Sequence, residues 1–200
     1  MEDGFDAYND NEDYTASLDR FEKMLSKNEQ YFFDVEEFEI LVDHYLDKSD
    51  TSKAKQVIDI SLLQHPTSSN LKLKKAHFFA ATHQPNKALQ ILNNLEAFEP
   101  FNAEIYTTKA TIHSQLRQHN KAIENFYKAL KLIADKSEKA NIKINIAFEY
   151  ENLNEFDKAI DILKKLLKEN PENETVLYEL AFCYNLKNDT DNSIQFFKEF

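Results

Sequence analysis

A 34-residue pattern recurs along most of this chain and constrains its fold more than any other feature. If Ala140 is position 1, small residues fall at position 8 (Ala147) and position 20 (Ala159), and a proline falls at position 32 (Pro171). Units that begin at residues 35, 69, 103, 140 and 174 keep this register. A fixed period of this length indicates stacked copies of one supersecondary unit. The chain is therefore expected to be an array, whose function lies on the surfaces that stacking creates.

The residue types at the repeated positions predict a helical hairpin in each unit. Small side chains let two antiparallel helices approach closely, and a proline near position 32 ends the second helix. Positions 8 and 20 are occupied by Val42, Ala76, Ala110, Ala147 and Ala181, and by Ala54, Ala88, Ala122, Ala159 and Ser193. The expected helices span about 35–47 and 51–64, 69–82 and 85–97, 103–116 and 119–134, 138–152 and 156–168, and 174–186 and 190–200. An all-α fold follows.

Residues that favour helix N-termini support these bounds. Asp34 lies three residues before Glu37, the spacing of a capping box, in which each side chain accepts from a free backbone N–H. Ser68, Asn102 and Asn173 precede the first helices of later units and are good N-cap residues.

Together these positions resemble the tetratricopeptide repeat (TPR), as five repeats over about residues 35–200. Position 11 strengthens the resemblance, because it reads Tyr45, Phe79, His113, Tyr150 and Tyr184. The resemblance implies an α-α superhelix, a right-handed solenoid of antiparallel helix pairs that is used mainly to hold protein partners. Position 8 is never glycine here, although the family often has glycine there.

The two ends of the chain differ from the repeats. Residues 1–12 are acidic and lack apolar periodicity, so they are expected to form a mobile tail. Residues 13–33 are expected to form an N-terminal capping helix and linker, because Leu18, Phe21 and Met24 recur at helical spacing. At the other end Phe196, Phe197 and Phe200 would face a following unit, which favours a natural protein that continues beyond residue 200. A frayed end or a dimer contact is the alternative.

Charge and composition exclude several classes of function. Residues 1–50 carry 16 acidic and 4 basic side chains, whereas residues 51–200 carry 19 and 20, so a nucleic-acid interface of clustered cations is disfavoured. The sequence has neither a signal peptide pattern nor an apolar run long enough for a membrane span. With a single cysteine, Cys183, we expect a cytoplasmic and reducing setting. The excess of lysine over arginine favours a bacterial source.

No pattern in the sequence predicts catalysis or a cofactor. Gly4 is the only glycine, so a glycine-rich phosphate loop is not possible, and the histidines lack the i, i+4 spacing of a helical zinc site. The acidic residues mostly occupy predicted solvent faces. We expect a protein that is not an enzyme and holds no metal ion or cofactor.

Partner binding is expected on the first helix of each unit. In this family positions 2, 5, 9, 12 and 13 line the concave groove. The candidate residues at and beside them are Glu36, Glu39, Asp43, Asp47, His77, Asn141, Asn145, Phe148, Asn152, Tyr178, Phe182 and Asn185. The first four form an acidic patch, and the last units combine aromatic rings with amides, as binding hot spots do. The competing interpretation is that Phe148 and Phe182 pack between adjacent first helices.

We therefore expect a non-catalytic scaffold that binds a protein or peptide in the groove. The family's capture of chaperone C-terminal tails needs Lys at position 5 and Asn at position 9 of one unit, and no unit here has that pair. An alternative is a docking or regulatory arm of a longer protein whose activity lies beyond residue 200. A third possibility is self-association through the C-terminal face.

Overall fold

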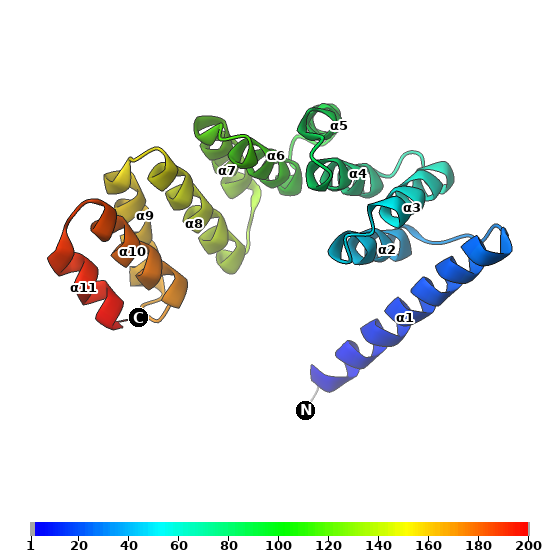
Figure 1. The fold of residues 1–200 in the computed structure, drawn as a ribbon, viewed down its shortest axis with the longest axis horizontal. Coiled ribbons are helices and arrows are strands. Elements are labelled where there is room, and N and C mark those ends of the chain that lie inside the picture. The colour runs from blue at the N-terminus through cyan, green and yellow to red at the C-terminus, as the bar shows by residue number, and fades with distance from the viewer. Residues whose placement is uncertain (1–2, 200) are drawn as a thin grey trace. The chain divides into compact units, whose positions relative to one another are not determined.

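The computed structural model describes the backbone of residues 3–199 and the side chains of residues 15–198. This part of the chain is all-α and belongs to the α-α superhelix class, with helices labelled in Figure 1. Their bounds are α1 Asp3–Lys27, α2 Val35–Asp47, α3 Thr51–Gln64, α4 Ser69–Ala81, α5 Pro85–Phe98, α6 Ala103–Gln115, α7 His119–Leu132, α8 Lys136–Asn152, α9 Phe156–Glu169, α10 Glu174–Leu186 and α11 Thr190–Glu199. None of these helices is long and apolar enough to cross a membrane.

The predicted hairpin helices lie within about two residues of their expected bounds, because the N-cap residues are where the sequence placed them. Asp34 and Glu37 form the capping box, in which the Asp34 backbone N–H donates to Glu37 Oε2 at 2.9 Å. The side chains of Ser68, Asn102 and Asn173 accept from backbone N–H groups at the starts of α4, α6 and α10.

Helix α1 differs from the expectation at its start. It begins at Asp3, whereas apolar periodicity predicts a helix only from about Tyr14. Residues 3–13 add no apolar stripe that sequence periodicity could detect, so the pattern gave no signal for this extension. The mobility expected for residues 1–12 stays a prediction.

The chain divides into two compact units, Met1–Phe98 and Glu99–Phe200, and each is considered by itself. In the first unit α1 packs on the hairpin of α2 and α3, and α4 and α5 form the next hairpin. Phe21 and Met24 of α1 are buried, as the predicted capping stripe requires. Phe21 meets Phe33 edge-on with ring centroids 5.9 Å apart. Phe32, in contrast, is 63% exposed.

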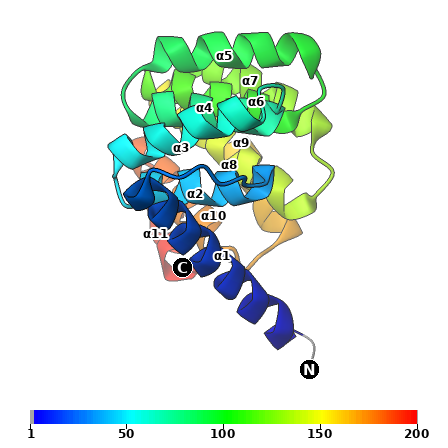
Figure 2. The same cartoon turned by 90° about the vertical axis from the view of Figure 1, so that its right-hand side faces the viewer.

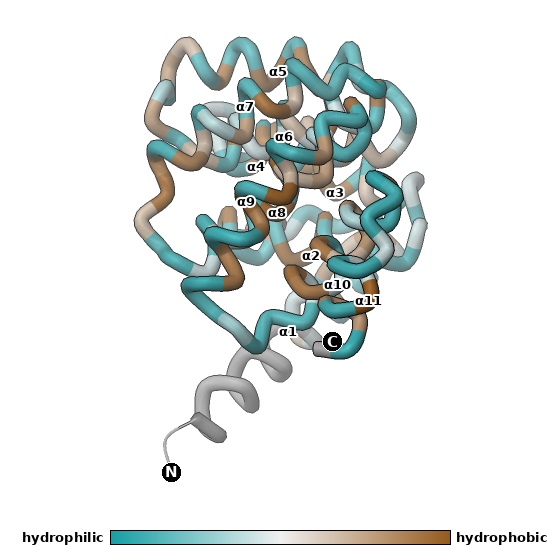
Figure 3. Tube along the Cα trace, turned by 90° about the vertical axis from the view of Figure 1, so that its left-hand side faces the viewer, coloured by the Kyte–Doolittle hydropathy of each residue, from teal (hydrophilic) through white to brown (hydrophobic). Residues whose placement is uncertain are grey.

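The second unit contains the hairpins α6–α7, α8–α9 and α10–α11. Its small residues at positions 8 and 20 are buried, including Ala110, Ala122, Ala147 and Ala159. Ser193 replaces alanine at position 20 of the last repeat, and its hydroxyl donates to the Ala181 carbonyl oxygen at 3.0 Å. That bond satisfies the buried hydroxyl, so serine is tolerated at this close contact. Hydrophobic and hydrophilic residues alternate along the helices, as Figure 3 shows.

Each hairpin turns through one residue in the left-handed region, always at position 15 of the repeat. These residues have φ between 56° and 61° and are Ser49, His83, Arg117, Asn154 and Asn188. The following residue donates its N–H back to position 11, as Gln118 does to the His113 carbonyl oxygen at 2.8 Å. A left-handed residue after a helix C-terminus is the usual way to close such a turn. Arginine is an uncommon choice there, because side chains with a Cβ are disfavoured in this region and asparagine tolerates it better.

Candidate functional site

The predicted aromatic residues of the second unit lie exposed on two first helices, α8 and α10. Phe148 is 52% exposed, Tyr178 44% and Phe182 36%. Tyr178 and Phe182 stack with centroids 6.4 Å apart and planes 5° from parallel, because they are one helical turn apart on α10. Phe197 of α11 meets Tyr178 edge-on at 6.1 Å. We call Phe148, Tyr178 and Phe182 the aromatic surface.

This exposure disfavours the interpretation in which Phe148 and Phe182 pack between first helices, whereas their role in binding stays a prediction. Had they packed between neighbouring first helices, both rings would be buried, as Ala147 and Ala181 beside them are. Instead about half of Phe148 and a third of Phe182 face solvent. Large apolar side chains on one helix surface form a site that another molecule can cover.

Amide side chains accompany the rings as predicted. Asn141, Asn145, Asn152 and Asn185 are all exposed on α8 and α10. Asn152 donates to the Phe148 carbonyl oxygen at 3.0 Å. A primary amide has two donor hydrogens and an acceptor oxygen, so these side chains can pair with the backbone of an extended peptide.

A polar cavity of about 450 Å³ adjoins Phe148 in the second unit. It is lined by Ser114, Gln115, Arg117, His119, Phe148 and Asn152. Four of these six residues stand at groove positions predicted from the repeat register. The other two, Arg117 and His119, lie at the turn between α6 and α7 and were not predicted as site residues.

A buried carboxylate holds one wall of this cavity. Glu149 is 2% exposed, and its two oxygens accept from the Ser114 hydroxyl at 2.5 Å and from His119 Nδ1 at 2.7 Å. These bonds join α8 to the end of α6 and the start of α7. Because the carboxylate accepts at Nδ1, the imidazole Nε2 is the ring nitrogen left for other contacts.

The acidic residues of the first unit are partly neutralised. Glu36, Asp43 and Asp47 are exposed and Glu39 is half-buried, all on α2. Lys74 of α4 forms an ion pair with Asp43 at 2.5 Å.

His77, the candidate on α4, is half-buried beside this ion pair. Burial lowers the pKa of its imidazole, and the charge of Lys74 lowers it further. The ring is therefore held neutral, and His77 adds no positive charge next to the acidic residues of α2.

Two residues at groove positions are buried and do not face a partner. Leu73 of α4 is 4% exposed. Glu151 of α8 is 7% exposed and accepts from the Cys183 thiol at 3.0 Å.

Desolvation raises the pKa of Glu151 to about 7, although the hydrogen bond from Cys183 lowers this pKa in part. Burial also raises the pKa of the Cys183 thiol, which the Glu151 carboxylate reinforces.

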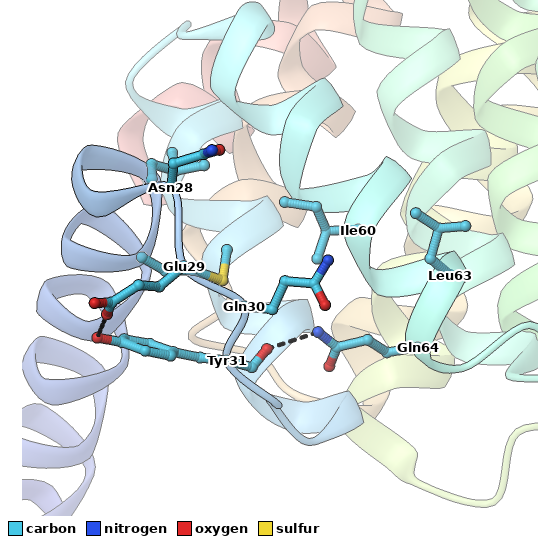
Figure 4. A pocket seen from close by; sticks show the side chains of 9 residues that line it. Asn28, Glu29, Gln30, Tyr31, Ile60, Leu63 and Gln64 are labelled. Atoms are coloured by element: carbon cyan, nitrogen blue, oxygen red, sulfur yellow. Dashed lines mark hydrogen bonds between the residues drawn. The ribbon is translucent and has the colours of Figure 1, made fainter.

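A second pocket, of about 430 Å³, was not predicted and lies between the linker after α1 and helix α3 (Figure 4). Met24, Leu25, Ile60 and Leu63 supply its apolar wall. Gln64 fixes the linker, because its amide nitrogen Nε2 donates to the Tyr31 carbonyl oxygen at 2.7 Å and its Oε1 accepts from the Phe33 N–H at 3.0 Å.

One of the aromatic side chains expected on the C-terminal face is buried within the last repeat. Phe196 is buried against Tyr184, with centroids 5.7 Å apart and planes 7° from parallel. Phe197 stays 45% exposed. Phe200 lies outside the described residues.

Residues 15–198 contain no cluster of three His, Cys, Asp or Glu side chains that could hold a metal ion. The site is instead a surface of aromatic rings and amides beside a polar cavity. It lies on pairs of antiparallel helices that contact each other through small buried residues. These features define a helical-repeat protein of the kind that binds other chains. Residues 103–136 and 153–199 match two models of the tetratricopeptide repeat. The chain is a tetratricopeptide repeat protein.

Solved structures of MamA share this fold. One, titled "Crystal structure of MamA protein", has a TM-score of 0.64 at 20% sequence identity. The aligned region covers 81% of this chain and 87% of the MamA chain. Another crystal structure of MamA has a TM-score of 0.65 at 20% sequence identity, over 84% of this chain and 94% of the MamA chain. The structure titled "MamA RS-1 ArsTM double mutant" has a TM-score of 0.66 at 13% sequence identity, over 81% of this chain and 89% of the MamA chain. No curated protein matches the chain in sequence.

Proposed function

We propose that this protein is a non-catalytic scaffold that binds a peptide segment of a protein partner along its first helices. The observation that carries this proposal is the exposure of Phe148, Tyr178 and Phe182 on α8 and α10. Tetratricopeptide repeats are interaction modules, so the remaining question is which surface makes the contact.

The aromatic surface has the composition of a binding hot spot. Covering a large apolar side chain that is exposed in the free protein stabilises a complex by about 1.5–3 kcal/mol when burial is complete. Partial burial gives less, so several rings are needed for a specific complex. Asn152 and Asn185 beside the rings supply hydrogen bonds that fix the direction of an extended chain.

The acidic residues of α2 add a preference for a basic partner segment. Glu36 and Asp47 are exposed. Their charges are screened over about 8–10 Å at physiological ionic strength, so they act on side chains that come close. We therefore expect a partner with an apolar portion for α8 and α10 and a basic portion for α2.

Selection from a library of random peptides tests this proposal. The wild-type chain is compared with a Phe148→Glu, Phe182→Glu variant that has the same helical content and melting temperature. The proposal predicts that peptides enriched on the wild type are lost on the variant. Enrichment that is equal on both chains would move the binding site away from the aromatic surface, and no enrichment on either would contradict peptide binding.

Two control variants make the comparison specific. A Lys165→Gln, Lys168→Gln variant lowers the net charge by the same amount on exposed positions of α9. A Leu63→Glu variant alters the pocket of Figure 4, where Leu63 is 82% exposed. Both controls are expected to retain the selected peptides.

Self-association is a second candidate function, and Ile194 and Phe197 favour it. They are 47% and 45% exposed on α11. Sedimentation at increasing protein concentration tests it, since a monomer at every concentration would exclude a dimer through α11. A dimer that is lost in a Phe197→Glu variant would support it.

A further inference from the structure

The cavity beside Phe148 contains a cation that the fold itself does not use. The Arg117 side chain is exposed and forms no ion pair or hydrogen bond with the residues whose side chains the structure describes. The other arginine, Arg20, bonds Glu37 at 2.6 Å and the Phe32 carbonyl oxygen at 2.7 Å. Arg117 thus has five N–H donors directed at whatever enters the cavity or at water.

The backbone at Arg117 favours a functional role for its side chain. Its φ is 56°, in the left-handed region, where the equivalent turns of the next two repeats have Asn154 and Asn188. Asparagine is among the residues that tolerate this region best, and arginine is not. A less suitable residue held in such a conformation is grounds for a hypothesis of function.

The start of helix α7 adds to the positive character of the cavity. His119 is held by Glu149 through Nδ1, so its ring is fixed in the cavity wall. His119 is also the first residue of the 14-residue helix α7, whose N-cap residue Gln118 makes no capping hydrogen bond with its side chain. The positive end of a helix favours a negative group nearby. The buried carboxylate of Glu149 beside His119 opposes this effect, so the guanidinium of Arg117 is the main attraction for an anion in the cavity.

We propose that this cavity binds the carboxylate of an Asp or Glu side chain within the partner peptide, with Arg117 as its charge partner. The inference rests on the proposed peptide-binding function and names one chemical group of the peptide. A guanidinium can grip a carboxylate through two parallel N–H bonds. An apolar residue next to the acid then covers Phe148.

We assign the acid to a residue within a peptide and not to its C-terminus, because the cavity lining includes side chains that can contact a continuing backbone. Gln115 and Asn152 each supply a primary amide at its edge. Such amides pair with the N–H and C=O of a continuing chain, whereas a terminal carboxylate would leave one of them without a peptide group.

The test is a selection from a random peptide library on the wild-type chain and on an Arg117→Asn variant. Asparagine is compatible with the left-handed turn, so this variant is expected to fold and to melt at the same temperature or higher. The wild type is expected to enrich peptides with Asp or Glu at one position beside an apolar residue, and the variant is expected to lose that acidic preference while keeping the apolar one.

Synthetic peptides from the selection then give the affinity. Replacement of the acidic residue by its amide is expected to weaken binding to the wild type about 10-fold or more, and to leave binding to Arg117→Asn within about twofold. The same peptide with its acid moved to a free C-terminus is expected to bind as weakly as the amide.

Failure of this inference is distinct from failure of the proposed function. Selected peptides without an acidic consensus, or with the same consensus on the Arg117→Asn variant, would overturn the acidic contact and leave peptide binding intact. Tighter binding by a C-terminal acid would overturn the assignment to an internal residue. Loss of all peptides on the Phe148→Glu, Phe182→Glu variant, with none lost on Arg117→Asn, would also contradict the role of Arg117.

Discussion

Cys183 of α10 donates its thiol hydrogen to Oε1 of Glu151 on α8 across 3.0 Å, in a region where both side chains are buried. This contact joins the first helices of two successive repeats beneath the aromatic surface. The thiol is a weak donor, so it does not compensate fully for the burial of a carboxylate, and the pKa of Glu151 is raised to about 7.

The raised pKa predicts that stability falls as the pH rises. Between about 4.5 and 7 the folded chain holds a proton on Glu151 that the unfolded chain has lost, so the free energy of unfolding decreases over this window. At about 1.4 kcal/mol per pKa unit, the change at this residue is on the order of 3 kcal/mol. Urea unfolding at pH 5 and pH 8 checks it.

A Glu151→Gln variant isolates this effect from other titrating groups. The amide stays neutral, so the difference in unfolding free energy between variant and wild type is expected to grow in the variant's favour as pH rises from about 5 to 8. A difference that stays constant with pH would show that Glu151 ionises normally in the folded chain.

The turn residues predict opposite effects for two substitutions at the same repeat position. Asn154→Ala is expected to destabilise the protein by about 1 kcal/mol, because alanine tolerates the left-handed region less well than asparagine. Arg117→Asn is expected to stabilise it by about 0.5 kcal/mol for the same reason. Thermal and urea unfolding measure both, and a loss of stability in Arg117→Asn would mean that its side chain supports the fold.

The close approach of the helices at position 8 predicts that a larger side chain there is not tolerated. Ala147 is 1% exposed at this contact, and Ala147→Leu is expected to cost about 1–3 kcal/mol through overpacking. Asn145→Leu introduces the same side chain at an exposed position of α8 and is expected to change stability by less than about 0.5 kcal/mol. Equal effects of the two variants would contradict the close packing.

The acidic residues of α2 predict that binding of a basic peptide weakens with salt. Asp47→Asn removes an exposed charge with no ion pair among the described residues, whereas Asp43 is already paired with Lys74. Asp47→Asn is therefore expected to reduce the salt dependence of affinity more than Asp43→Asn does. Titrations of the peptide at low and high salt measure this. An affinity that is independent of salt would show that the acidic residues of α2 do not contact the peptide.

The repeat register predicted the hairpins well because the constraint behind it is steric and local. A small residue such as Ala147 or Ala159 is needed wherever two helices touch, and that need is visible in one sequence. The register also placed Phe148 and Phe182 on an exposed surface.

The cavity was missed because it depends on residues outside the groove positions. Arg117 stands at position 15, where a turn residue is expected, and His119 starts the second helix. A signal was present, since Arg117 is the one long cationic side chain at a position that otherwise has Ser49, His83, Asn154 and Asn188. The burial of Glu151 and Leu73 could not be predicted from position alone, because it depends on how neighbouring helices cover them.

The most direct test of peptide binding at the aromatic surface is an amide chemical-shift map of the labelled chain titrated with the tightest selected peptide. We expect the largest saturable changes on α8 and α10 around Phe148, Asn152, Tyr178 and Phe182, with Arg117 and His119 affected at the adjoining turn. Changes confined to the second helices α9 and α11, or to the pocket beside Leu63, would contradict it.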